Sequence, residues 1–169
     1  MPIRRRAVAL LATATAGLAL VAPTSFAQAP GATTLTFFEP DAGSTFRIVD
    51  NTPKSPTTNP ESRRYRFSAG DTLTLSSPLF DRQGGTRQGT LYAHAVVVSG
   101  RTFASIRLLA TGSYVLTDGS QLEVTGVVSL SRPSRFAIVG GSGRYAGARG
   151  SVASTSNANS STDVLTLLP

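Results

Sequence analysis

The glycines of "RFAIVGGSGRYAGARG", residues 135–150, have the spacing closest to a known chemical motif in this sequence. Five glycines fall within eleven residues, and residues 141–146 fit G-x-G-x-x-G/A, a pattern that cradles dinucleotide phosphates. That chemistry needs a helix directly after the glycines, because the pyrophosphate binds the N–H groups of its first turn. The residues that follow are rich in Ser and Asn, with no apolar set at helical spacing. The segment is therefore predicted to be a glycine-dependent turn between two strands that binds no nucleotide.

Other familiar site chemistries are limited by composition. The chain has no Cys, which excludes thiol catalysis and Cys-ligated metal. His94 is the single histidine, so a multi-histidine metal site is impossible and a Ser-His-Asp triad has one candidate base. The basic residues are scattered apart from Arg63, Arg64 and Arg66, which favours a solvated surface over a nucleic-acid interface. We therefore expect neither a metal site nor a nucleic-acid partner.

The first 27 residues have the pattern of a secretory signal peptide. Arg4, Arg5 and Arg6 precede an apolar stretch over 7–22, which is short for a membrane span. The small-x-small site at 25–27 predicts cleavage after Ala27, which would release the protein outside the cell without a membrane attachment. The alternative is a retained membrane anchor.

Cleavage there would leave one domain of ordinary size. Removing 27 of the 169 residues gives a mature chain of 142, residues 28–169. The net charge falls from +7 to +4, because three arginines are lost. A chain of this length can bury its own core without disulfides.

The elements that must position any site are predicted to be strands. After residue 30, runs of β-branched and aromatic residues alternate with Gly, Pro, Asn and Asp clusters. The segment over 50–64 carries three prolines and is predicted to be an exposed loop, and Asp118-Gly119 signals a hairpin. The predicted strands are Thr33–Phe38, Thr45–Val49, Thr72–Ser76, Thr90–Val98, Thr102–Leu116, Gln121–Leu130, Phe136–Val139, Ser151–Thr155 and Val164–Leu168.

Two of these runs, "YAHAVVV" and "FASIRLLA", are apolar on both faces over part of their length. Strands of this kind need cover on both sides. In a barrel, the outer face would be covered by another molecule, and an oligomer is one natural cover. The number and length of the strands fit a small antiparallel barrel or a sandwich.

Four segments in order, "GDTLTLSSPLFD", "QGTLYAHAVVV", "DGSQLEVTG" and "FAIVGGSGRYAGARGSV", resemble the allene oxide cyclase/dirigent superfamily. The ending "DVLTLLP" is similar to the last strand of small secreted bacterial members, and the resemblance covers about residues 33–169. It implies an all-β fold, a closed eight-stranded antiparallel barrel. The glycine-rich segment would be a strand–turn–strand corner of that barrel. Its turn glycines are Gly140, Gly141, Gly143, Gly147 and Gly150.

The resemblance also implies a function. Members hold a hydrophobic small molecule inside the barrel, and the cyclases and dirigent proteins steer a cyclisation or a coupling without a cofactor. Positioning in an apolar cavity with few polar groups is the physical basis. The family is typically trimeric, so a homo-oligomer is expected here.

Carried over residue by residue, the resemblance points to Glu39 as the one polar pocket position that keeps its identity. Asp41 stands where the cyclases have Asn, and it shares the strand parity of Glu39. Ser77, Ala95 and Val128 replace the Asn, Cys and Tyr of the cyclase pocket. These departures argue against strict allene oxide cyclase activity. Glu39 and Asp41 are the candidate catalytic residues, because a carboxylate buried in a barrel is costly unless it is used or paired.

The other positions expected to line the pocket are Phe37, Leu91 and Ala93. His94 and Tyr92 have the parity opposite to Ala95, so both are expected to point outward. The face of Tyr114 is left open.

Three functions remain open at this point. The protein is a cofactor-free cyclase or dirigent-like protein, a barrel that binds a ligand without catalysis, or a structural protein whose interior is filled. A cavity of about 300 Å3 or more would favour the first two, and a filled barrel would favour the third.

Overall fold

A computed structural model describes residues 31–60, 62–129 and 132–169. The predicted signal peptide and its cleavage site lie outside the described residues. The strands are β1 (Thr33–Pro40), β2 (Thr45–Val49), β3 (Thr72–Phe80), β4 (Arg87–Ser99), β5 (Arg107–Leu116), β6 (Gln121–Val128), β7 (Ser134–Ser142), β8 (Gly150–Asn157) and β9 (Ser160–Leu167). No helix in the described part of the chain is long and apolar enough to cross a membrane.

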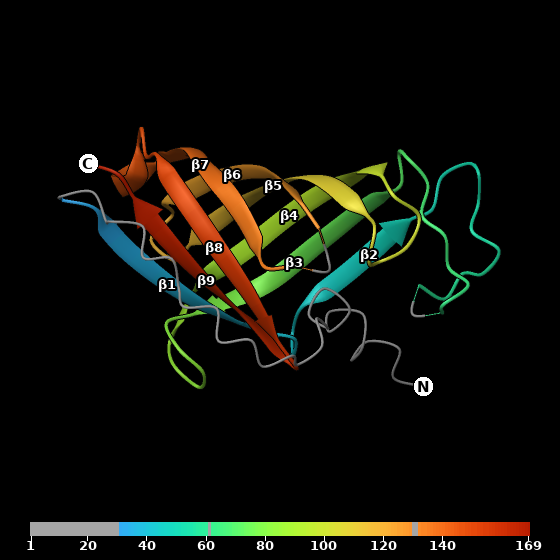
Figure 1. Ribbon diagram of the computed structural model, residues 1–169. Helices are drawn as coiled ribbons and strands as arrows, with labels where there is room; N and C mark the ends of the chain where they lie inside the picture. The colour runs from blue at the N-terminus through green and yellow to red at the C-terminus, as the bar shows by residue number, and fades with distance from the viewer. Residues whose placement is uncertain (1–30, 61, 130–131) are drawn as a thin grey trace, which may run out of the picture.

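Eight of the strands form a closed antiparallel barrel, as predicted (Figure 1). From β3 to β9, each strand pairs with the next along the chain, and β9 pairs with β1. The ring closes where β1 meets β3, with Phe38 opposite Phe80. The remaining strand, β2, lies outside the ring and pairs with β3.

The β1–β9 pairing brings the two ends of the described chain together. Thr33 lies opposite Leu167, and the register continues to Pro40 opposite Ser160. Gly31 lies beside Pro169, whose ring would be 3.7 Å from a Cβ atom at Gly31.

Alternation along the strands builds two core clusters, one toward each end of the barrel. The first core cluster consists of Phe37, Leu79, Leu91, Tyr114, Leu116, Leu122, Val124, Ile138, Val152, Leu165 and Leu167. The second core cluster consists of Tyr65, Phe67, Leu73, Ala95, Val97, Ile106, Leu108, Ala110 and Val128. Burial of these apolar side chains is the main stabilising contribution to the fold.

The loop before β3 supplies two aromatic residues of the second core cluster. No strand interrupts residues 50–60 or 62–71, in agreement with the predicted proline-rich loop. Tyr65 and Phe67 pack edge to face with their ring centroids 4.9 Å apart. The fully buried Asp71 carboxylate accepts hydrogen bonds from the backbone N–H groups of Asn51 (2.8 Å) and Ser68 (2.9 Å). The loop is thus tied to the barrel at both of its ends.

The glycine-rich segment connects two antiparallel strands, β7 and β8. It contains a single turn of 3₁₀ helix, η3 (Gly143–Tyr145), which the sequence prediction of a plain turn did not include. Gly150 begins β8 with a φ of +150°, and a Cβ atom there would overlap the carbonyl oxygen of Thr166. Close backbone approach is therefore the reason for this glycine.

Several predicted strand boundaries are wrong, and the two largest errors at strand starts are these. The strand predicted from Thr102 begins at Arg107, because the backbone N–H groups of Ser105 and Ile106 turn back to the Thr102 carbonyl. The last strand begins at Ser160 rather than Val164, because the chain turns at 158–159 and pairs again at once with β8. This second correction places Asp163 inside the sheet.

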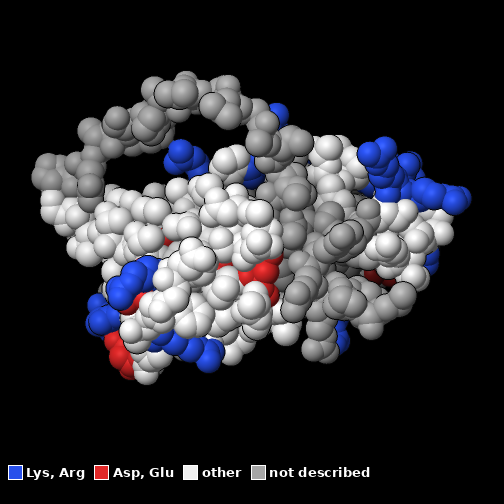
Figure 2. Space-filling view, turned by 90° about the horizontal axis from the view of Figure 1, so that it is seen from below, with Lys and Arg blue, Asp and Glu red and all other residues white. Residues whose placement is uncertain are grey.

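Charged groups are distributed unevenly over the surface. Figure 2 shows Lys and Arg side chains gathered mainly toward the two ends of one face, with a small acidic group between them. The exposed Arg63, Arg64 and Arg66 belong to the loop before β3.

Candidate functional site

A cavity of about 140 Å3 lies inside the barrel. Its walls include members of both core clusters, such as Leu91 and Tyr114 of the first and Leu73 and Leu108 of the second. The volume is close to that of a cavity that holds one benzene ring. It falls short of the roughly 300 Å3 expected for a larger ligand, so the barrel is neither filled nor widely open.

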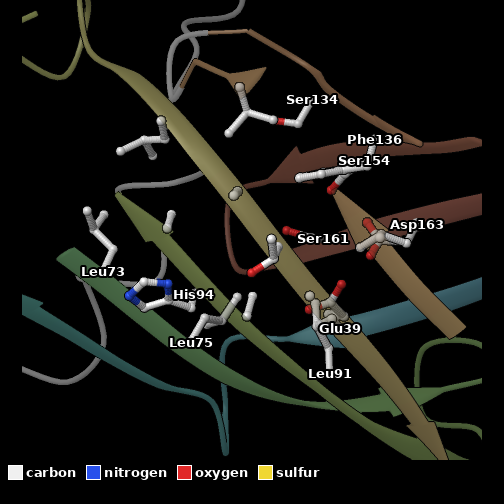
Figure 3. A pocket seen from close by; sticks show the side chains of 18 of the residues that line it. Glu39, Leu73, Leu75, Leu91, His94, Ser134, Phe136, Ser154, Ser161 and Asp163 are labelled. Carbon is white, nitrogen blue, oxygen red and sulfur yellow. The ribbon is translucent and has the colours of Figure 1, made fainter. Parts of the chain in front are cut away.

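Two buried carboxyl groups from neighbouring strands share one wall of this cavity. Glu39 on β1 lies opposite Ser161 on β9, and Asp163 lies opposite Phe37. Glu39 and Asp163 are therefore diagonal neighbours on the inner face. Their exposed fractions are 6% and 2%. Figure 3 shows both side chains on the side of the cavity that also carries Ser134, Ser154 and Ser161.

The environment of Glu39 favours its protonated form. Burial is the main cause that raises its pKa well above the ordinary value, and the nearby charge of Asp163 and a hydrogen bond to Asp163 raise the pKa further. A hydrogen bond with Ser77 acts in the opposite direction. Glu39 therefore holds a proton under conditions in which a surface carboxyl has lost it.

Tyr114, on the facing strand β5, hydrogen-bonds to the Asp163 member of this carboxyl pair. Its hydroxyl donates a hydrogen bond of 2.5 Å to Asp163 Oδ2. Burial, followed by the charges of Asp163 and Glu39, raises the pKa of Tyr114 well above its ordinary value, so the phenol keeps its proton and remains a donor. Its ring stacks on Phe37 with centroids 5.8 Å apart, which fixes the direction of the hydroxyl.

A chain of hydrogen bonds through Ser77 and Ser44 connects Glu39 to the turn between β1 and β2. The hydroxyl oxygens of Ser77 and Ser44 lie 2.8 Å apart, and the Ser44 hydroxyl also lies 2.8 Å from the carbonyl oxygen of Pro40. A hydroxyl group can donate or accept a hydrogen bond, so Ser77 can hydrogen-bond to Glu39 whether the Glu39 carboxyl is protonated or ionised. The network fixes the carboxyl at the end of β1.

The wall opposite Asp163 includes small apolar residues. Ala93 pairs with Gly112, and Ala95 pairs with Ala110, across β4 and β5. In the order of the ring, β5 stands four places from β9, which carries Asp163. The missing side-chain bulk at these four positions leaves the cavity open between the two clusters.

The structure brings most of the predicted site residues together. Glu39, Leu91, Ala93, Ala95 and Val128 all line the cavity. The predicted pocket residues Phe37 and Ser77 are buried beside the carboxyl pair and contact Tyr114 and Ser44, but they are not part of the lining.

Asp41 lies apart from the cavity lining, although the sequence paired it with Glu39. Strand β1 ends at Pro40, so Asp41 belongs to the following turn, where its backbone N–H donates to the Asn159 carbonyl. Burial raises its pKa, but its side chain is only partly buried. Tyr92 and His94 are exposed, as their strand parity predicted.

Sequence reasoning missed Asp163 and Tyr114. Both carried a usable signal, because Asp163 shares the parity of Leu165 and Leu167, and Tyr114 shares that of Leu116. An acidic residue in phase with core leucines predicts a buried carboxylate. The prediction of a shorter last strand hid this pattern for Asp163.

The fold has known structural counterparts. A pyocyanin demethylase superimposes with a TM-score of 0.60 and 16% identity, covering 80% of this chain and 100% of that chain. The pterocarpan synthase dirigent protein GePTS1 has a TM-score of 0.59 and 18% identity, covering 80% of this chain and 82% of that chain. This protein has the allene oxide cyclase/dirigent-like barrel fold.

A third dirigent-like barrel is AbnU, an exo-specific intermolecular Diels-Alderase, with a TM-score of 0.50 and 11% identity. It covers 80% of this chain and 98% of its own. No protein-family model and no curated protein matches the sequence. At these identities the likeness is one of fold, and the chemistry must be argued from the site.

Proposed function

We propose that this dirigent-like barrel binds a small aromatic molecule in its interior and steers its cyclisation by proton transfer, without a cofactor. The observation that carries the proposal is the buried Glu39–Asp163 pair on the wall of an otherwise largely apolar cavity. Burial raises the pKa of the Glu39 carboxyl, and a carboxyl with a raised pKa is suited to act as a general acid.

In the proposed reaction, Glu39 gives its proton to the bound substrate as the new ring forms. The Glu39–Asp163 pair then recovers a proton from the product, so a cyclisation leaves the atomic composition unchanged. Tyr114 holds Asp163 in place and is a positioning residue. The cavity contributes by restricting the substrate to one folded shape.

The structural neighbours support this class of reaction by analogy only. Their names describe a demethylase, a dirigent protein and a Diels-Alderase, which are all proteins that act on small organic molecules. Transfer to this chain rests on the shared barrel and on the carboxyl pair found inside it.

Binding without catalysis is the second candidate function. The modest volume of about 140 Å3 favours it, because so small a cavity limits the rearrangements a substrate can make. Phe46 and Phe136 line the cavity and are only half-buried, so movement of these rings would enlarge it for a longer ligand.

The proposal includes export and self-association. The signal-like residues 1–27 support secretion, and N-terminal sequencing of protein from its own host should begin at Gln28. The exposed apolar residues Val98, Leu109 and Val127 on three adjacent strands support a homo-oligomer, a trimer by family resemblance.

The deciding experiment is native mass spectrometry of the protein purified from its own host. A retained aromatic ligand is expected, and Glu39→Gln should weaken its binding by about 1–3 kcal/mol, the usual scale for leaving a buried hydrogen-bonding group without its partner. Matching Glu123→Gln, on the outer face, should leave binding unchanged. Equal ligand retention by both variants would refute a role for Glu39.

A further inference from the structure

The cavity is lined by two carboxyl groups, and among the described residues that line it none is Lys or Arg. The charges that act on Glu39 and Tyr114 come from acidic groups alone, and they raise both pKa values. His94 on β4 also borders the cavity, but its side chain is exposed on the outer face of that strand. A carboxylate in this setting creates a strong negative potential, because little water screens it.

Asp163 also has spare capacity to accept hydrogen bonds. Its Oδ2 atom accepts from Tyr114, whereas its buried Oδ1 atom receives no hydrogen bond from a described N–H or hydroxyl group. Glu39 in its protonated form also hydrogen-bonds to Asp163. A carboxylate has room for about four hydrogen bonds, so a donor on a ligand would find an open acceptor here.

The opposite wall is shaped for a flat apolar ring. Ala93, Ala95, Ala110 and Gly112 form a patch of small residues on β4 and β5, across the barrel from β8 and β9. The cavity of about 140 Å3 beside this patch matches the volume needed for one aromatic ring. A ring lying on the small-residue patch would direct its substituent toward Asp163 on β9.

We infer that the cavity selects one aromatic ring bearing a hydrogen-bond donor or a positive charge, and that it rejects carboxylates and other anions. The inference rests on the proposed function, since it names the class of ligand for the same cavity. A phenolic hydroxyl or a protonated amine would donate to Asp163 Oδ1, whereas an anion would meet the buried negative charge with no cation to offset it.

Four ligands with one ring test the inference: benzylamine, p-cresol, toluene and benzoate. Each is titrated into the purified protein while the amide signals of Ala110 and Gly112 are followed by NMR. Benzylamine and p-cresol should bind roughly 10- to 100-fold more tightly than toluene, the range that corresponds to a hydrogen bond to a charged group. Benzoate should bind more weakly than toluene. This comparison needs no variant, so it does not depend on how a variant folds.

Two variants then assign the preference to Asp163. Asp163→Asn keeps the shape but removes the charge, and it should abolish the advantage of benzylamine over benzoate. Tyr114→Phe keeps both the charge and the stacking on Phe37, so it should preserve that advantage.

The outcomes separate this inference from the proposed function. Benzoate binding as tightly as benzylamine, with shifts at Ala110 and Gly112, would overturn the charge selection and leave binding in the cavity intact. A preference that survives Asp163→Asn would also overturn it. If none of the four ligands shifts these signals, both the inference and the proposed function are wrong.

Discussion

Glu39 is held in a place where ionisation is costly, and this has a consequence for stability. The folded protein binds the Glu39 proton more tightly than the unfolded chain does. As the pH rises from the ordinary carboxyl value of 4.5 through the raised pKa of Glu39, the unfolded chain releases this proton first. The Glu39 contribution to the free energy of unfolding therefore decreases with rising pH, the opposite of the usual salt-bridged carboxylate.

Replacing Glu39 with Gln should remove this decrease in the free energy of unfolding with rising pH. We expect Glu39→Gln to unfold at the same or a higher urea concentration than the natural protein at neutral pH, because the amide needs no ionisation. Urea titrations at a series of pH values measure the difference, with Glu123→Gln as the control that retains Glu39. Parallel pH profiles for the natural protein and Glu39→Gln would contradict the assignment of a raised pKa.

Among the elements, strand β5 carries Gly112, whose lack of a side chain leaves space in the cavity. Gly112 has no positive φ, and a Cβ atom there would lie 3.3 Å from the backbone carbonyl oxygen of Tyr92 and from Val124 Cγ2, and 3.4 Å from Leu91 Cδ1. Gly112→Ala should change stability by less than about 1 kcal/mol, because each neighbour need move by only a few tenths of an ångström and Ala lowers the entropy of the unfolded chain. It should weaken binding of toluene, because the added methyl group occupies part of the cavity.

Gly89 on the neighbouring strand β4 is the matched control. A Cβ atom there would overlap the backbone carbonyl oxygen of Val115, which cannot move aside without breaking the sheet. Gly89→Ala should therefore lower the free energy of unfolding by several kcal/mol, on the order of other overpacking changes in a core. Thermal denaturation measures the stabilities of Gly112→Ala and Gly89→Ala. Equal stabilities would refute this account.

The loop before β3 depends on a single carboxylate. Asp71 accepts hydrogen bonds from Asn51 and from both the backbone and the hydroxyl of Ser68. Asp71→Ala should cost about 2–4 kcal/mol, because it leaves buried donors without an acceptor. Amide exchange over 51–68 should accelerate more than exchange in β5. Asp71→Asn, which keeps one oxygen acceptor, should cost less, and the prediction fails if the two variants are equally stable.

The strands themselves explain how far sequence reasoning could go. Runs of β-branched and aromatic residues located every strand but not all of the strand boundaries, and Glu39 followed from the resemblance of "TLTFFEPD" to a known first strand. The meeting of Glu39 with Asp163 could not be predicted, because it depends on the register between the first and last strands. The depth of the cavity depends in the same way on which small residues face one another across β4 and β5.

At the scale of the whole molecule, the outer surface carries exposed apolar side chains on neighbouring strands. Leu109 and Val127 are 48% and 63% exposed and lie opposite each other on β5 and β6. We expect the protein to be an oligomer by light scattering and Leu109→Arg to be a monomer, because a buried, unpaired charge opposes association. Thr111→Arg, also exposed on β5, should leave the oligomer intact. A monomeric natural protein would refute the proposed trimer.

Gly31 and Pro169 lie side by side, so the two ends of the described barrel meet beside the β1–β9 pairing. A short linker joining these two residues would preserve every strand pairing, and the chain could be cut instead at Gly84, an exposed glycine in the turn between β3 and β4. Such a circular permutant should fold and bind as the natural protein does, because permutation is tolerated where ends are close and cuts fall in exposed loops. In the permutant, the strand that carries Glu39 would no longer be the first strand along the chain. The carboxyl pair would then lie on strands that follow one another directly along the chain, as a hairpin that can be inserted, exchanged or diversified as one cassette.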